Sequence, residues 1–273
     1  MAIRTRKIGG GGLYLKAIIY GHFGVGKTLL ACTAGEHPDM FPVLVVNIEG
    51  GGITASNIPN VTETEQLGGY SDVEEVFWKL ANKDVDEEDE DGPRVDWGAF
   101  KTVVIDSGSA VQDMNIMEVA RANATAKKSA SRISQQDWGD STRQVGELLR
   151  RFKALPMHVI VTARQRDGYP EGFDDAKKAT VGPTTASADF TPALRRHVNH
   201  TFDHVWAMTA DSDGQRWLLP ADNGTYKAKT RGPAFQAKMG DALMIRNPSD
   251  PESEGMAIPE IFNLFKQTQG SKQ

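Results

Sequence analysis

Residues 21–28, Gly-His-Phe-Gly-Val-Gly-Lys-Thr, match the phosphate-binding pattern G-x-x-x-x-G-K-[ST] at every fixed position. Its glycines let the backbone turn tightly and aim successive N–H groups at one anion, which residues with a Cβ could do only under strain. An apolar run at 15–20, typical of a buried strand, precedes the loop, and a helical pattern at 28–34 follows it. A nucleotide site is therefore favoured over a glycine-rich turn without a ligand. The residues expected to contact the nucleotide are Gly21, His22, Phe23, Gly24, Val25, Gly26, Lys27, Thr28 and Leu29.

The composition bounds the kind of protein that can surround this loop. With 273 residues, 39% of them hydrophobic and 25% charged, the chain has the size of one large α/β domain with short appendages. No apolar stretch approaches the ~20 residues that cross a bilayer, so we expect a soluble, cytoplasmic protein without a membrane partner. Cys32, the one cysteine, is expected to be an inert buried thiol.

The formal charge of −5 is unevenly distributed. Seven acids lie between Asp84 and Asp91, and the rest of the chain carries +2. We expect this run to be a solvated loop, because so many like charges cannot be buried together. The overall charge therefore gives no argument against nucleic acid as a partner.

Apolar runs alternate with helical patterns along the first two thirds of the chain. This order predicts an α/β fold with a mostly parallel sheet flanked by helices on both faces. In the last third, Asn223-Gly224 separates two strand patterns and suits the turn of a β-hairpin, whereas 166–190 is expected to be a long loop. The predicted strands are 15–20, 42–48, 102–105, 159–162, 205–209, 216–219 and 225–229, and the predicted helices are 28–34, 71–82 with a capping box at its start, one from after Ser107 through Ala120, 141–155 and 259–265.

Polar residues follow three of the predicted buried strands. Ligands of an open parallel sheet bind beyond the carboxyl ends of its strands, so these residues are expected to face the nucleotide. Asp106 is placed to hold Mg²⁺ through water, while Thr28 supplies a hydroxyl ligand; Asp106 could instead cap the next helix. Glu49 is the candidate for the base that orients the attacking water; the alternative is a structural carboxylate bonded to the backbone of Gly50–Gly52.

The third strand ends in Thr162-Ala163-Arg164-Gln165. Thr162, Arg164 and Gln165 are all candidates for a group that senses the γ-phosphate, and an ordinary exposed strand end is the alternative. The register of the strand decides between them, and the sequence leaves that register open.

These motifs resemble the core of the RecA/RadA recombinases. The similarity rests on a strand ending in Asn47-Ile-Glu-Gly, on Val104-Ile-Asp-Ser and on Val161-Thr-Ala-Arg. Gln136-Asp-Trp-Gly and Leu155-Pro-Met-His-Val-Ile resemble the phage nucleotide-binding, single-strand annealing branch of that superfamily. The similarity spans about residues 13–232, which leaves a basic, glycine-rich arm at 1–12 and an extension with a short helix at 233–273.

The resemblance implies a RecA-like P-loop ATPase fold with ATP and Mg²⁺ as cofactors. It also implies single-stranded DNA as a partner, a single-strand binding protein, head-to-tail self-association in a ring or filament, and the host cytoplasm of a phage protein. Ala163-Arg164 replaces the Asn-Gln usual in recombinases, and we expect no counterpart in these residues of the additional DNA-binding or oligomerisation domain of recombinases. These departures disfavour strand exchange, whereas DNA binding and annealing remain open.

Two basic segments extend this interpretation. Lys227, Lys229 and Arg231 alternate along a predicted strand and so share one face. By the same resemblance, Lys229 and Arg231 would reach into a neighbouring subunit's nucleotide site, where cations stabilise charge on the γ-phosphate; a solvated basic strand is the alternative.

For DNA, a flexible basic loop is expected at 121–136, with an exposed helix extension as the alternative. The residues expected to follow a phosphate backbone are Arg121, Lys127, Lys128 and Arg132, with Arg164 and Arg166 at the start of the later loop.

Other functions share the phosphate loop. A nucleotide or small-molecule kinase is the main alternative, together with a P-loop ATPase that does not act on DNA. A GTPase is disfavoured because Asn82-Lys-Asp continues with Val85, and an AAA+ remodelling ATPase because Asp106 lacks a following Glu. His197, His200 and His204 have helical spacing but no matching acid or cysteine partner, so ordinary histidines are favoured over a metal site.

Overall fold

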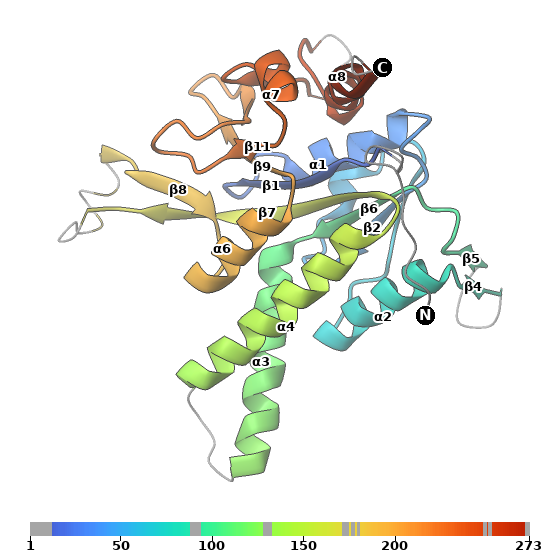
Figure 1. Ribbon diagram of the computed structural model, residues 1–273, viewed down its shortest axis with the longest axis vertical. Coiled ribbons are helices and arrows are strands. Elements are labelled where there is room, and N and C mark those ends of the chain that lie inside the picture. The colour runs from blue at the N-terminus through green and yellow to red at the C-terminus, as the bar shows by residue number, and fades with distance from the viewer. Residues whose placement is uncertain are drawn as a thin grey trace.

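The computed structural model describes residues 13–87, 94–127, 133–170, 175, 178, 181–247, 250 and 253–270. The arm expected at 1–12 lies outside this part of the chain. One mixed sheet forms the centre of the molecule, and helices cover both of its faces (Figure 1). Among the described residues, no helix is long and apolar enough to cross a membrane.

The strands of the main path follow the order β12-β10-β9-β1-β7-β6-β2-β3. All neighbours from β9 to β3 are parallel, whereas β10 is antiparallel to both β9 and β12. This arrangement confirms the mostly parallel α/β fold predicted from the alternating pattern. The strand bounds are β1 Lys16–Gly21, β2 Val43–Asn47, β3 Val61–Glu63, β6 Thr102–Asp106, β7 His158–Gly168, β9 His204–Ala210, β10 Arg216–Leu219 and β12 Leu243–Ile245.

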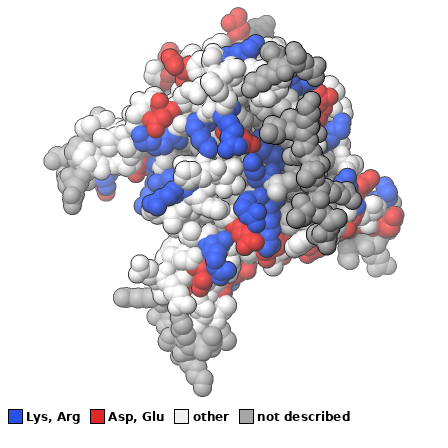
Figure 2. Space-filling view, viewed as in Figure 1, with Lys and Arg blue, Asp and Glu red and all other residues white. Residues whose placement is uncertain are grey.

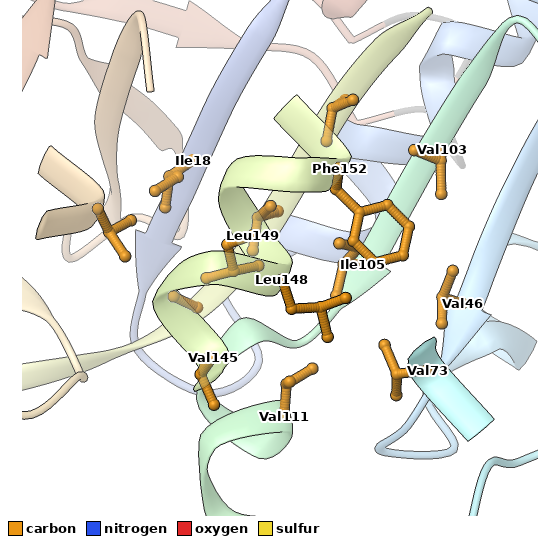
Figure 3. Close-up of a cluster of buried hydrophobic side chains, with 14 of the residues drawn as sticks. Ile18, Val46, Val73, Val103, Ile105, Val111, Val145, Leu148, Leu149 and Phe152 are labelled. Carbon is orange, nitrogen blue, oxygen red and sulfur yellow. The ribbon is translucent and has the colours of Figure 1, made fainter. Parts of the chain in front are cut away.

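The helices form two layers (Figure 1). One face of the sheet carries α2 (Tyr70–Asn82), α3 (Gly108–Lys127), α4 (Gln135–Ala154) and α6 (Pro192–Thr201), and the other carries α1 (Lys27–Cys32), α7 (Pro233–Met239) and α8 (Ile258–Gly270). Side chains of the central strands alternate between the layers: Ile18 packs toward α4, and Ile19 packs toward α1. Figure 3 shows part of the first core, where Phe152 of α4 lies over the sheet. Burial on both faces explains why these strands are continuous apolar runs.

Several helices begin or end at other residues than the sequence predicts. Helix α3 runs on to Lys127, so 121–127 is helical and not a loop; alanine at every second position from Ala120 to Ala126 favours helix there. Helix α4 begins at Gln135, earlier than the predicted residue 141, because Ser134 and Asp137 form a capping box. Helix α2 begins at Tyr70, and the side chain of Asp72 accepts from the N–H of Gly69 at 2.9 Å.

The expected loop at 166–190 has strands at both ends. Strand β7 continues to Gly168 and pairs antiparallel with β8 (Thr185–Ala188). The prediction failed because the apolar residues of β7 end where the strand leaves the core, although its backbone pairing continues with β8.

The expected hairpin between 216–219 and 225–229 does not form. Strand β10 instead pairs with β9 through a turn in which Asp211 accepts from the N–H of Asp213 and of Gln215. Strand β11 (Lys229–Thr230) also pairs with β9, at its amino end. Gly224 does adopt a positive φ of 93°, but in a loop, so a turn dipeptide alone does not decide which strands it joins.

The acidic run is only partly described. Val85–Asp86 forms strand β4, paired with β5 (Val95–Asp96). Asp86 is not merely solvated, since its carboxylate accepts from Nζ of Lys79 at 2.7 Å and from Nε1 of Trp97 at 2.8 Å. Residues 88–91 lie outside the described residues. Helices α6 and α7 and strand β12 were not predicted.

Candidate nucleotide-binding site

The phosphate loop connects β1 to α1, and its glycines are required by the geometry. A methyl group placed on Gly21 would lie 2.3 Å from the carbonyl oxygen of Met208 on the adjoining β9. Gly24 and Gly26 adopt φ angles of 76° and 96°, which disfavour any residue with a Cβ. The close strand packing and the left-handed turns together shape the loop expected from the sequence.

Lys27 folds back over this loop. Its ammonium donates to the carbonyl oxygens of Gly21, at 3.0 Å, and of His22, at 2.8 Å. Burial lowers the pKa of Lys27, and the nearby carboxylates of Asp106 and Glu49 oppose that shift. The ammonium is therefore held by two carbonyl oxygens of the loop, and the oxygens of a bound phosphate could replace these carbonyls as its partners.

Asp106, at the end of β6, joins the loop to the neighbouring strand. One carboxylate oxygen accepts from Oγ1 of Thr28 at 2.9 Å, and the other accepts from Oγ1 of Thr162 on β7. Asp106 and Thr162 are both buried. A carboxylate and a hydroxyl held this close are oxygen donors of the kind that Mg²⁺ prefers, so Thr28 and Asp106 fit the predicted metal site.

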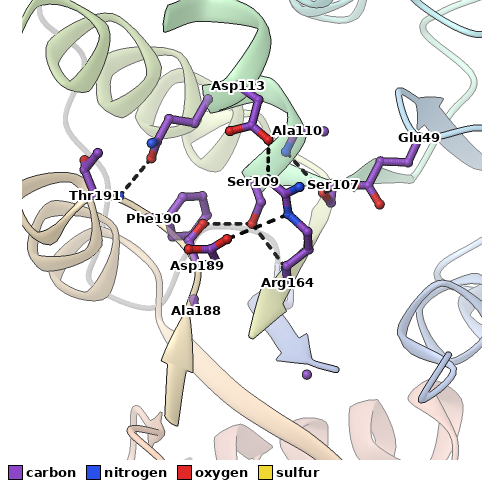
Figure 4. Close-up of polar contacts among 12 residues, drawn as sticks. Glu49, Ser107, Ser109, Ala110, Asp113, Arg164, Ala188, Asp189, Phe190 and Thr191 are labelled. Carbon is purple, nitrogen blue, oxygen red and sulfur yellow. Dashed lines mark hydrogen bonds and ion pairs between the residues drawn. The ribbon is translucent and has the colours of Figure 1, made fainter. Parts of the chain in front are cut away.

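Glu49 follows β2, next to β6 in the sheet. Its carboxylate accepts from Oγ of Ser107 at 2.6 Å, and Ser107 Oγ in turn accepts from the N–H of Ala110 at 3.2 Å (Figure 4). The backbone N–H of Glu49 donates to the carbonyl oxygen of Asp106 at 3.3 Å. The exposed Glu49 carboxylate is therefore held beside Asp106 by the residue that follows Asp106.

The three candidate sensors have different surroundings. Thr162 contacts Asp106, as described above, and Gln165 lies 2.8 Å from Nε2 of His22 in the phosphate loop. The guanidinium of Arg164 instead pairs with Asp113 of α3 and with Asp189, 3.8 Å away (Figure 4). The structure thus places Thr162 and Gln165 beside Asp106 and the phosphate loop, whereas Arg164 is paired with α3.

The residues expected to bind DNA are spread over two regions. Arg121 lies exposed on α3, and Lys127 is the last residue of that helix. Lys128 and Arg132 lie outside the described residues. Arg166 is exposed on β7, close enough to Arg195 for its charge to contribute to the lowered pKa of Arg195, of which burial is the larger cause.

Lys229 and Arg231 lie toward the opposite end of β9 from the phosphate loop of their own chain. Lys229 pairs with Val205 at the amino end of β9, whereas Gly21 pairs with Met208 toward the carboxyl end. Arg231 contacts Asp203 at 2.5 Å, and Lys153 lies 3.6 Å from the same carboxylate. The pKa of Lys229 is lowered by burial and by the charge of Arg231. These cations therefore do not face their own nucleotide site.

The histidines singled out in the sequence are not grouped. His197 and His200 are exposed on α6, and His204 is buried at the start of β9. In the part of the chain that the structure describes, no three His, Cys, Asp or Glu side chains form a metal-binding group. Cys32 is buried, and burial raises the pKa of its thiol to about 12.

Sequence reasoning missed Arg216, whose guanidinium lies beside Gly26 of the phosphate loop. No motif includes Arg216. Its position depends on the turn between β9 and β10, whereas the sequence predicts that 216–219 pairs with 225–229. The turn sequence Asp211-Ser-Asp-Gly, with Gly214 at a φ of 80°, is the signal that could have found it.

A family model described as an AAA domain matches residues 13–232. The match holds although Ser107 follows Asp106, so the absence of a second acid at that position does not exclude this family. No curated protein matches the sequence.

Proposed function

The chain belongs to the AAA-domain family of P-loop ATPases, and on that premise we propose that it hydrolyses ATP with Mg²⁺ and acts on single-stranded DNA in phage recombination. The observation that carries the ATPase part is the convergence of Lys27, Thr28, Asp106 and Glu49 from three neighbouring segments. Each of these groups matches one requirement of phosphoryl transfer.

Each residue has its own task in the proposed site. The N–H groups of the glycine loop and the ammonium of Lys27 bind the phosphates, whose charge would replace the carbonyl contacts of that ammonium. Bound Mg²⁺ would neutralise charge on the phosphates, with Thr28 and Asp106 as its protein ligands. Glu49, oriented by Ser107, accepts a hydrogen bond from the attacking water and aligns it.

The DNA part of the proposal draws on the resemblance to the annealing branch and on the shape of the molecule. Helices α3 and α4 project beyond the sheet, and so do β7 and β8 on another side (Figure 1). Arg121 and Lys127 lie on the first projection, and Arg166 lies on the second. Cations on such projections can follow a sugar-phosphate backbone without reading its sequence.

The assembly part draws on Lys229 and Arg231. Both lie at the amino end of β9 and so would act on another subunit's site. Figure 2 shows lysine and arginine side chains gathered on the face that carries α4, α6 and the start of β11. In a head-to-tail contact, this cationic face of one copy would meet the nucleotide site of the next.

One experiment separates the main functions that share the loop. ATP hydrolysis is measured alone and with single-stranded DNA, duplex DNA or a panel of nucleoside monophosphates. We expect stimulation by single-stranded DNA of any sequence. Turnover that rises only with a monophosphate, with phosphate transferred to it, would instead identify a kinase. The variant Lys127→Ala/Lys128→Ala/Arg132→Ala should lower DNA affinity and flatten its salt dependence, whereas Arg94→Ala/Lys101→Ala/Lys238→Ala, which removes three exposed cations elsewhere, should not.

The assembly proposal is tested by mixing two inactive variants. Glu49→Gln has a dead site and intact cations, and Lys229→Ala/Arg231→Ala has an intact site without them. Mixtures should regain DNA-stimulated hydrolysis where the two kinds of subunit adjoin. Failure to complement in mixtures shown to co-assemble would mean that these cations do not act across a subunit boundary.

A further inference from the structure

Arg216, at the start of β10, lies directly beside the phosphate loop. A methyl group placed on the α-carbon of Gly26 would lie 3.3 Å from Nε of Arg216 and 3.4 Å from its Cζ. The guanidinium therefore packs against the loop one residue before Lys27. Arg216 reaches this place because it pairs with Ala210 at the carboxyl end of β9, the end that adjoins the loop.

The fold itself makes little use of this side chain. Among the described residues, no carboxylate forms an ion pair with Arg216. Its Nη1 lies 3.4 Å from Oδ1 of Asn247, longer than an ordinary hydrogen bond. Arg246, by contrast, is anchored to Glu36. A half-buried arginine without a carboxylate partner, placed at a ligand loop, is available to a ligand.

The order of the strands shows which half of the ligand Arg216 would meet. In the path β10-β9-β1-β7-β6, the loop follows β1, while Asp106 belongs to β6 and Arg216 to β10, on opposite sides. Thr28 and Asp106, which contact each other, would hold the metal and hence the terminal phosphates on the β6 side. The nucleoside half of a bound nucleotide would then lie on the β10 side of the loop.

The geometry points to Arg216 as a nucleoside-binding residue, whose planar guanidinium stacks on the base of the bound nucleotide. This inference rests on the nucleotide site proposed above. Guanidinium groups stack on aromatic faces, and an ammonium does not do so in the same way. In the proposed site the phosphates already have Lys27, the loop N–H groups and the cations of a neighbouring subunit as partners.

Calorimetric titrations with Mg–ATP and with Mg–tripolyphosphate test this assignment, because the second ligand has the phosphates but no base. Arg216→Ala should weaken ATP binding about tenfold, the size of a lost stacking contact, and change tripolyphosphate binding less than about twofold. Arg216→Lys should lose ATP affinity in the same way. Arg94→Ala, which removes an exposed arginine next to β5, serves as the matched control and should bind both ligands like the parent.

Three results would overturn the assignment: unchanged ATP affinity in Arg216→Ala, an equal loss for both ligands, or parental ATP affinity in Arg216→Lys. A parent protein that binds neither ligand would instead contradict the nucleotide site itself, and this inference with it. Thermal melts of each variant show whether a loss reflects local chemistry or unfolding.

Discussion

Asp106 connects the phosphate loop to the rest of the sheet through two threonines, Thr28 and Thr162. The sequence predicted Asp106 and Thr28, because both occupy fixed places in a pattern or follow a buried strand. It could not select Thr162 over Arg164, since a shift of one residue in a strand reverses the direction of every side chain. The β6–β7 register, in which Ile105 pairs with Val161, turns Thr162 toward Asp106.

Replacing the metal carboxylate tests this arrangement. Asp106→Asn keeps the shape of the side chain but removes its charge, so half-maximal hydrolysis should require at least about tenfold more Mg²⁺. Asp113→Asn, which removes an exposed acid of α3, is the control. An Mg²⁺ titration of Asp106→Asn that overlays the parent curve would show that this carboxylate does not serve the metal.

Two buried histidines make stability depend on pH. Burial lowers the pKa of His158 and of His204 from 6.5 to about 4. Both are neutral in the folded protein, whereas the unfolded chain takes up protons below pH 6.5. The stability that each contributes is therefore present above pH 6.5 and is lost as pH falls toward 4.

His204 gives the cleaner test, because its ring packs among Trp206, Phe235 and Phe265. Between pH 7 and pH 4.5, the free energy of unfolding of His204→Phe should fall by about 2.5 kcal/mol less than that of the parent. Urea melts at both pH values measure the difference. His200→Asn, on the exposed side of α6, should follow the parent, and an identical decline in His204→Phe would disprove the role of burial.

At the scale of elements, the sequence located buried strands well and their ends poorly. Strands β1, β2, β6 and β9 are apolar runs with both faces covered, so their composition alone predicts them. The ends of elements outside the core are determined by backbone pairing and by helix capping, which give weaker signals in the sequence than apolar runs do. The start of α4 shows this, because Ser134 caps it although no apolar residue of its buried stripe comes before Val145.

The helix start can be tested by removing one hydroxyl at a time. Ser134→Ala should lower the free energy of unfolding by about 1 kcal/mol, because it removes the acceptor for the N–H of Asp137. Ser141→Ala should be neutral or slightly stabilising, since its buried hydroxyl has no hydrogen-bond partner among the described residues. If chemical denaturation showed Ser141→Ala to be less stable than Ser134→Ala, the result would instead support a helix that starts near residue 141.

At the scale of the whole molecule, the segments after residue 232 pack into the core. Phe235 of α7 and Phe262 of α8 belong to the same buried cluster as Ile19 of β1, and β12 extends the sheet beside β10. This packing also supports β10, the strand that carries Arg216 beside the loop. The sequence could not predict this packing, because a short apolar helix and a three-residue strand carry no pattern that indicates which elements they contact.

The central claim is that one site, built from the phosphate loop, Asp106 and Glu49, binds ATP and hydrolyses it. Its most direct test is to measure Mg–ATP binding and steady-state hydrolysis for the parent, Lys27→Ala, Glu49→Gln and the control Glu65→Gln. We predict that Lys27→Ala abolishes binding, that Glu49→Gln binds normally but turns over at least about 100-fold more slowly, and that the control matches the parent. Parental turnover in Glu49→Gln, or undiminished ATP binding in Lys27→Ala, would contradict the account.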